Sequence, residues 1–204
     1  PYPPRLPDAP LVPGFALYGA DFFDPDTPLM LFDLICDRDP LSYVLDNILL
    51  PIVRHWVSCF LNFGFLLEPH GQNVLLELAE DRTVRRIVHR DLSVGIDMRR
   101  RRDLGLSSEH LNNYNRSQQP AFHSVTYDRF MGGHFFDRIV AACLGRYHRL
   151  TREDFTRPCR REFARLFPEH REYFPKTVWY FSEERDQFNK PFYQDIGTAP
   201  EWRP

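Results

Sequence analysis

Four polar side chains are concentrated in one short segment, Glu68-Pro69-His70-Gly71-Gln72-Asn73, between two apolar stretches. A second polar pair, Arg90-Asp91, follows the next apolar stretch. A carboxylate beside an imidazole and two amides offers a ligand for a divalent cation and donors for phosphate oxygens. Magnesium is commonly held by one or two carboxylates together with substrate phosphates, so Asp91 helped by Glu68 is sufficient. The residues therefore predict a magnesium-nucleotide site.

A purely structural interpretation of the same segment stays open. Gly71 at a positive φ angle, with Asn73 capping the backbone, would make a tight turn without any ligand.

The elements that must position these residues follow from a change of sequence period. Residues 73–78 and 83–89 are two β-rich runs, and the charged residues 79–82 separate them. This pattern is typical of a β-hairpin.

The hairpin register decides which polar side chains meet. If the loop closes at residues 79–82, counting back in an antiparallel register puts His70 roughly opposite Asp91 and Gln72 roughly opposite His89. Both polar motifs then lie at the open end of one hairpin.

Helical patterns surround this hairpin. The apolar stretch 29–66 predicts a buried helix, with Asp46 and Asn47 as possible caps and a regular part that begins near Pro51. Helical spacing returns around 130–144 and 162–166, and 177–181 resembles a short strand. The predicted class is α+β, a mostly helical domain with a small antiparallel sheet that carries the His-Gly-Gln-Asn and Arg-Asp motifs.

Two regions are expected. Residues 1–28 are rich in proline and predict an extended arm that crosses the surface of the protein. Residues 29–204 form the main domain, which at 43% hydrophobic and 15% aromatic content for the whole chain can bury a real core.

Composition excludes several classes of function. The net charge of -2 gives no chain-wide electrostatic reason to bind nucleic acid. No apolar run approaches the roughly 20 residues of a membrane span, so we expect a soluble cytoplasmic protein without membrane contact. The cysteines lack paired metal-ligand spacing, and apolar neighbours predict structural thiols at Cys36, Cys59 and Cys143.

Three further motifs have to be considered as functional or as structural features. His89-Arg90-Asp91-Leu92 matches the start of a protein-kinase catalytic loop, but Ile96 stands where that loop has asparagine. The run 99–102 of four arginines indicates a solvated face more than a phosphate patch, because acidic residues flank it. Lys176 fits either the rim of a site or the plain surface.

The segment 64–76, followed by an acidic turn and Arg90-Asp91, resembles the aerobactin-synthetase type of siderophore synthetase, which works without nonribosomal peptide synthetases. The resemblance implies the carboxyl-terminal, palm-like half of that fold. It also implies ATP and Mg²⁺ as cofactors and the joining of a citrate-like carboxylate to an amine or hydroxylamine through an acyl-adenylate.

The resemblance assigns roles residue by residue. His70 would contact the substrate and the activated phosphate, Asp91 would hold magnesium with help from Glu68, and four residues would bind the nucleotide: Gln72, Asn73, Arg90 and Lys176. It also implies two partners for this chain. One is the amino-terminal half of the same enzyme, which would complete the site, and the other is a second copy of the chain in a homodimer.

Two alternatives remain. A ferric-siderophore reductase is one, but such reductases have a carboxyl-terminal cysteine cluster, and here only Cys159 lies in the last quarter. The other is a non-catalytic remnant of the synthetase fold that binds a ligand or a partner chain.

Overall fold

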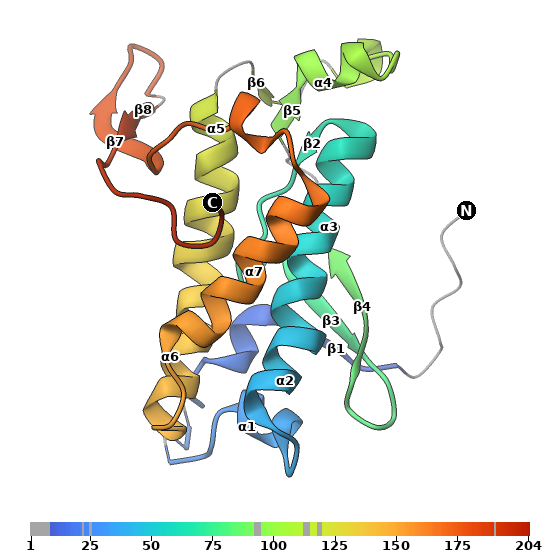
Figure 1. Cartoon of the computed structure of the whole chain (residues 1–204), viewed down its shortest axis with the longest axis vertical. Helices are drawn as coiled ribbons and strands as arrows, with labels where there is room; N and C mark the ends of the chain where they lie inside the picture. Colours follow the sequence, from blue (N-terminus) through green and yellow to red (C-terminus); the bar gives the residue numbers. More distant parts are fainter. Residues whose placement is uncertain are drawn as a thin grey trace.

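Long helices running side by side dominate the computed structural model (Figure 1). The structure describes residues 9–21, 23–24, 26–91, 95–111, 115–117, 120–189 and 191–204. The helical segments, π-helical and 3₁₀ turns included, are η1 (Gly14–Leu17), α1 (Met30–Ile35), α2 (Pro40–Val44), η2 (Leu45–Leu49), α3 (Leu50–Phe63), α4 (Met98–Asp103), η3 (Glu109–Leu111), α5 (Pro120–Ser124), η4 (Val125–Phe136), α6 (Asp137–Arg146), α7 (Arg152–Leu166) and η5 (His170–Glu172).

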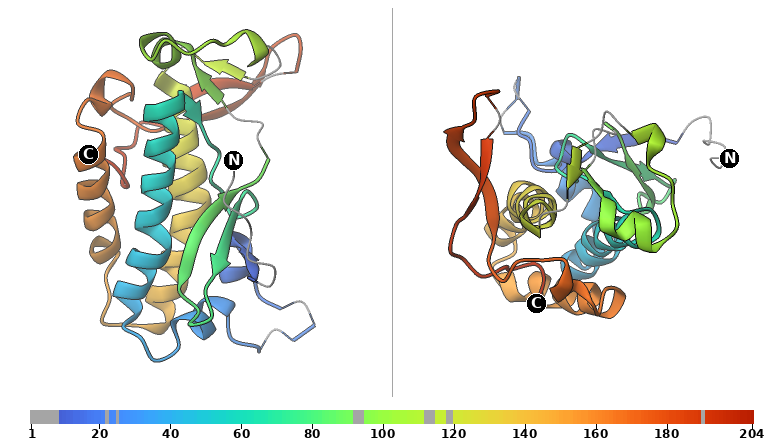
Figure 2. Two further views of the ribbon diagram at one scale, coloured as in Figure 1. Left: turned by 90° about the vertical axis from the view of Figure 1, so that its right-hand side faces the viewer. Right: turned by 90° about the horizontal axis from the view of Figure 1, so that it is seen from above.

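Three small sheets accompany the helices, so the predicted α+β class is confirmed. Their strands are β1 (Leu11–Pro13), β2 (Phe65–Leu66), β3 (Val74–Leu78), β4 (Val84–His89), β5 (Gly95–Asp97), β6 (Asn115–Ser117), β7 (Trp179–Arg185) and β8 (Pro191–Asp195). The orders are β1-β3-β4, β2-β5-β6 and β7-β8, and among the strands of the described residues only β5 and β6 pair in parallel. Figure 2 shows α7 and the β3–β4 hairpin on different sides of α3.

An aromatic cluster joins α3, η4 and α7 in the core. Trp56 lies edge-on to Tyr127 at a centroid distance of 5.1 Å, and Tyr127 lies 4.5 Å from Phe163. All three side chains are fully buried. Burial of each large apolar side chain stabilises the fold by about 1.5–3 kcal/mol. The Trp56 indole also donates to the Leu67 carbonyl at 3.2 Å, which ties the core to the residue preceding Glu68.

The first long helix begins earlier than the sequence predicted. Asp39 is the cap, because its side chain accepts from the Ser42 amide, and Pro40 occupies the first turn. The helix then continues through η2 into α3, whose regular α-helical part begins at Leu50, so the predicted start of the regular part near Pro51 is confirmed. The predicted caps Asp46 and Asn47 were wrong, because Asp39 caps the helix. Pro51 follows the π-helical turn, where the hydrogen-bond ladder is already offset.

This helix contradicts the expectation that no apolar stretch approaches the length of a membrane span. Pro40–Phe63 is long and apolar enough to cross a membrane, with a mean hydropathy of 1.3. The core helix of a soluble protein passes the same test, and this one packs its buried face against α7 and η4.

The arm predicted for 1–28 contributes to the fold at two places. β1 adds an edge strand to β3, and Leu17 of η1 is fully buried. Residues 1–8, 22 and 25 of this arm lie outside the described residues.

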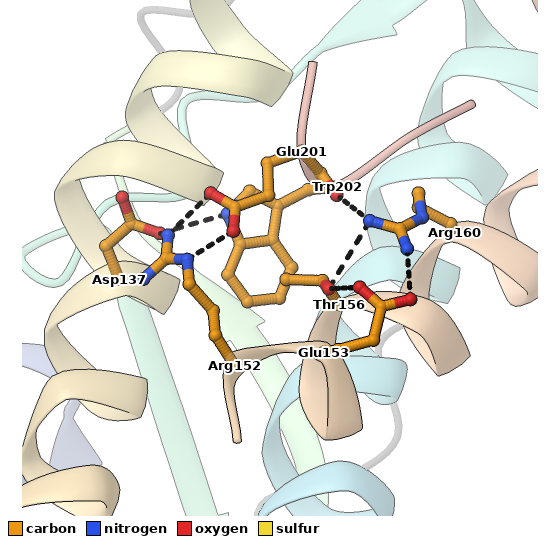
Figure 3. Close-up of polar contacts among 7 residues, drawn as sticks. All are labelled: Asp137, Arg152, Glu153, Thr156, Arg160, Glu201 and Trp202. Atoms are coloured by element: carbon orange, nitrogen blue, oxygen red, sulfur yellow. Dashed lines mark hydrogen bonds and ion pairs between the residues drawn. The ribbon is translucent and has the colours of Figure 1, made fainter. Parts of the chain in front are cut away.

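The carboxyl-terminal residues pack between η4, α6 and α7 (Figure 3). Arg152 pairs with Asp137 and Glu201, and the Trp202 indole donates to Asp137 at 3.0 Å. A Cβ on Gly132 of η4 would lie 2.5 Å from the Trp202 ring, so only glycine allows this contact.

Arg203 completes this tail with a buried ion pair. Its guanidinium donates to both oxygens of Asp128 in η4 at 3.0–3.1 Å, and to the Pro175 carbonyl. The Asp128 carboxylate also accepts from the Ser124 hydroxyl at 2.6 Å. The tail is therefore tied to η4 through the Asp128 carboxylate.

We expect Arg203→Met to lower the free energy of unfolding by about 3–5 kcal/mol, because it leaves the Asp128 carboxylate buried and unpaired. Denaturant unfolding measures this, with the exposed Arg157→Met as the matched control. Adding Asp128→Asn should recover part of the loss, because it removes the unpaired charge. A loss no greater than that of the control would contradict the assignment.

Candidate functional site

The turn from Glu68 to Asn73 is fixed by its own backbone and by Asn73. The His70 carbonyl accepts from the amides of Asn73 and Val74, and the Asn73 side-chain amide donates to the Glu68 carbonyl at 3.2 Å. Asn73 is 6% exposed, whereas Gln72 is exposed. Asn73 thus shapes the turn, and Gln72 presents its amide to the outside.

Glycine is required at position 71 because neighbouring atoms leave no room for a side chain, and not because of its φ angle. The glycines of the described residues with positive φ are Gly64, Gly105 and Gly197, so the predicted left-handed Gly71 was wrong. A Cβ on Gly71 would lie 2.3 Å from the Tyr18 hydroxyl and 2.9 Å from the Phe15 amide. The Gly71 carbonyl accepts from that amide at 2.9 Å, which anchors the turn to η1.

The hairpin forms as predicted, but its register differs by two residues. Val74 pairs with His89, and the Arg90 amide donates to the Asn73 carbonyl at 2.9 Å. One residue of the difference arises because Leu78 pairs with Val84 and not with Thr83, and the other arises from an irregularity between Glu77 and Leu78. Gln72 is therefore not opposite His89.

Arg90 and Asp91 still reach the turn. The Arg90 side chain donates to the Gln72 carbonyl at 2.6 Å. Asp91 is exposed and has a φ of 61°, a left-handed conformation that aspartate tolerates better than most residues. Asp91 lies two residues beyond the end of β4 at His89.

Electrostatic coupling shows that the carboxylates and His70 are close together. Burial, with the Asp91 charge second, raises the pKa of Glu68 to about 7. Burial lowers the pKa of His70, which the charge of Asp91 opposes. His70 is thus held neutral near neutral pH. Its Nδ1 atom accepts from the Gln72 amide at 3.3 Å, which leaves the proton of the neutral ring on Nε2.

The residues at the hairpin end fit a magnesium ion only together with a ligand. No group of three or more His, Cys, Asp or Glu side chains in the described part of the chain is arranged to hold a metal ion by itself. Glu68 and Asp91, which repel one another when both are ionised, supply two carboxylates. Substrate phosphates commonly complete such a coordination shell.

Lys176 is the predicted site residue that the described contacts do not join to this group. It is exposed on the loop between η5 and β7. Among the described residues it forms no hydrogen bond or ion pair with the hairpin end. The structure thus brings together six of the seven predicted residues by contact or charge, namely Glu68, His70, Gln72, Asn73, Arg90 and Asp91.

The arginine run is only partly a solvated face, so that prediction was wrong for two of its members. Arg100 donates to the Leu61 carbonyl and Arg101 to the Phe63 carbonyl, each at 2.7 Å. These carbonyls end α3 without intrahelical partners, and the two arginines cap them. Arg99 pairs with Glu172 at 3.0 Å.

The cysteines are free thiols, but one differs from expectation. Cys36 is exposed and not in an apolar environment, and Cys143 and Cys159 are buried. Burial raises the pKa of Cys59 to about 11 and of Cys143 and Cys159 to about 12. These three therefore hold their protons at neutral pH, unlike metal-bound thiolates.

Sequence reasoning missed an aromatic wall beside His70. Phe130 of η4 lies edge-on to His70 at 5.7 Å, and His134 lies 5.7 Å from Phe130 and 5.5 Å from Tyr180 of β7. The sequence signal for this wall was the spacing of Phe130 and His134. Only the tertiary structure shows that this face of η4 meets the hairpin end.

Comparisons with known proteins find one family match. Residues 41–195 match the family described as ferric iron reductase FhuF-like transporter. A search of curated proteins finds no match.

Similar solved structures include three siderophore biosynthesis proteins. The petrobactin biosynthesis protein AsbB from Bacillus anthracis str. Sterne is 14% identical with a TM-score of 0.63 over 80% of this chain and 29% of that one. The aerobactin synthetase IucC from a hypervirulent pathotype of Klebsiella pneumoniae is 12% identical, with a TM-score of 0.71 over 97% of this chain and 36% of that one. The ATP-bound aerobactin synthetase IucA from the same source is 12% identical, with a TM-score of 0.64 over 97% and 37%.

The chain thus spans about a third of the length of these proteins and has the fold of that part. The resemblance seen in the sequence is confirmed at the level of fold.

The raised pKa of Glu68 predicts a pH dependence of stability. Between the ordinary glutamate pKa of 4.5 and the raised pKa of about 7, the folded chain keeps a proton that the unfolded chain loses. The free energy of unfolding of the wild type should therefore fall as pH rises through this window. Glu68→Gln removes this contribution, so denaturant unfolding should show the variant gaining stability relative to wild type from about pH 5 to about pH 8.

Partial exposure of Glu68 and solvent screening reduce the size of this effect. Glu80→Gln in the exposed hairpin turn is the control and should show no such trend. A Glu68→Gln difference that stays constant across the window would contradict the pKa assignment.

Proposed function

The chain belongs to the family described as ferric iron reductase FhuF-like transporter and has the fold of part of the siderophore synthetases, and from these premises we propose that it contributes to siderophore biosynthesis. Its role is to supply part of the ATP and magnesium site of an ATP-dependent ligase. This ligase joins a citrate-like carboxylic acid to an amine or hydroxylamine.

One observation carries the proposal, which is the convergence of His70, Gln72, Arg90, Asp91 and Glu68 at one end of the β3–β4 hairpin. Two carboxylates next to a neutral imidazole, an exposed amide and a guanidinium suit a phosphate chain that carries a divalent cation. The IucA relative is described as ATP-bound, which supports the same assignment.

The reaction makes use of these residue types. A carboxylate oxygen of the acid attacks the α-phosphorus of ATP, the bond to pyrophosphate breaks, and an acyl-adenylate forms. The amine nitrogen then attacks the acyl carbon, AMP leaves, and the amine loses a proton. Magnesium held by Asp91 and Glu68 would neutralise phosphate charge.

In this reaction His70 acts as a hydrogen-bond donor. Because its Nδ1 faces the Gln72 amide, the Nε2–H of the neutral ring is the group available to a phosphate or acyl oxygen. A single preorganised donor of this kind contributes about 3 kcal/mol to stabilising developing charge. Gln72 and Arg90 supply further donors, Asn73 fixes the turn that presents them, and Lys176 stays a proposed nucleotide contact at the rim.

The remaining substrates and partners follow from the same proposal. The chain spans about a third of the synthetases that it resembles, so the amino-terminal half of the enzyme is the partner that completes the site. A homodimer is a second possible assembly. An enzyme that consumes ATP belongs in the cytoplasm.

Calorimetric titration with ATP and Mg²⁺ tests the nucleotide assignment. We expect wild-type binding to weaken at least about tenfold in Asp91→Ala, because the loss of a cation ligand costs more than about 1.4 kcal/mol. Asp103→Ala, at the exposed end of α4, is the matched control and should bind like wild type. An absence of binding, or equal binding by both variants, would favour the non-catalytic remnant.

His70→Ala tests the chemistry once the amino-terminal half is added. Pyrophosphate release with a citrate-like acid and a polyamine should fall by about two orders of magnitude, the usual effect of removing one such donor. Unchanged release would refute the role of His70.

A ferric iron reductase is the second candidate, because the family match carries that description. In the described part of the chain, no three His, Cys, Asp or Glu side chains are grouped to hold a metal ion, which disfavours a cysteine-bound iron cluster. We expect the purified protein to be colourless. Visible absorption together with bound iron and sulfide would instead support the reductase.

A further inference from the structure

Arg129 of η4 differs from the arginines that have a structural role. Arg152 and Arg203 are paired with carboxylates, whereas Arg129 forms no ion pair within the described part of the chain. Its guanidinium lies over the Tyr180 ring at 4.8 Å, and its buried Nε atom has no hydrogen-bond partner among the described residues. A planar guanidinium with unused donors, held by an aromatic ring, suits an oxyanion.

The position of Arg129 connects it to the candidate site. Phe130, the next residue, contacts His70, and Tyr180 contacts both Arg129 and His134. Residues four or five apart in a π-helix share a face, so Arg129 and His134 lie on the same side of η4. One face of η4 therefore carries a guanidinium and an imidazole, and Phe130 of the same helix contacts His70.

The charges that reach this surface are mostly positive. The guanidinium groups of Arg129 and Arg138 act on His134 as cations, and the carboxylate that acts on it is Asp137. Asp137 is already engaged, since it accepts from Arg152 at 2.5 Å and from the Trp202 indole at 3.0 Å. The η4 side of His70 thus favours anions, while Glu68 and Asp91 favour cations at the hairpin end.

We propose that Arg129, with His134 beside it, binds a free carboxylate of the polycarboxylic acid substrate, one that is not itself activated. The assignment of this anion as substrate rests on the proposed function. The anion site itself rests only on Arg129, His134 and their surroundings. Arg129 is therefore a specificity-determining residue that selects acids with more than one carboxylate.

Phosphate oxygens are the other oxyanions with the same chemistry. Phosphates that carry magnesium are drawn to Glu68 and Asp91, whereas a free carboxylate is repelled by these two side chains. This difference favours a carboxylate at Arg129, and the experiment separates the two sources.

Calorimetric titration of the chain with citrate, without nucleotide, tests the proposal. We expect Arg129→Gln to weaken citrate binding about tenfold or more, the effect of losing a charge-assisted hydrogen bond. Arg129→Lys keeps the charge but loses the planar fork, so it should bind with intermediate affinity. Arg146→Gln is the matched control, because Arg146 stacks on Phe32 and has no ion pair in the described structure; it should bind like wild type.

Titration of the same variants with ATP and Mg²⁺ separates this inference from the proposed function. Citrate binding that depends on Arg129 in a chain that binds no ATP would uphold the anion site and refute the nucleotide site. Wild type without citrate binding, Arg129→Gln with unchanged citrate binding, or an equal loss of citrate and ATP affinity would each overturn the proposal. If Arg129→Gln does not fold, Tyr180→Leu, which frees the guanidinium from its ring, should weaken citrate binding several-fold, and unchanged binding would overturn it.

Discussion

The contact between Gly71 and η1 is the constraint on which the candidate site depends. The Phe15 amide is bound to the Gly71 carbonyl at 2.9 Å, and the Tyr18 hydroxyl occupies the place where a side chain would begin. Tyr18 also packs against Phe135 of η4, with ring centroids 6.2 Å apart. The amino-terminal segment, the hairpin end and η4 therefore meet at one point. Any larger residue at 71 would separate them.

Because these segments meet, His70 lies between a region that favours cations and a region that favours anions. Glu68 and Asp91 come from the turn and from the end of β4, while Arg129 and His134 come from η4. The buried Arg203–Asp128 pair and the Trp202–Gly132 contact hold η4 from its other side. The position of the anion-favouring face thus depends on residues near the carboxyl terminus.

Much of the hairpin end could be predicted from the sequence, because the change from helical to alternating period marks β3 and β4 locally. The exact pairing could not, since a hairpin loop longer by one residue and an irregularity between Glu77 and Leu78 together move His89 opposite Val74. The reason for Gly71 was also missed, because the contact with Tyr18 joins distant parts of the chain. For the same reason, Arg100 and Arg101 gave no local signal of capping α3. The ligand roles of the site residues stay predictions.

A crystal structure of the chain with a non-hydrolysable ATP analogue and Mg²⁺ tests the central claim most directly. The account predicts the phosphates and the metal at the open end of the β3–β4 hairpin, with the cation on Asp91 and phosphate oxygens within hydrogen-bond reach of His70 Nε2 and Gln72. A nucleotide bound elsewhere, or a hairpin end that binds neither phosphate nor metal at saturating ligand, would contradict it.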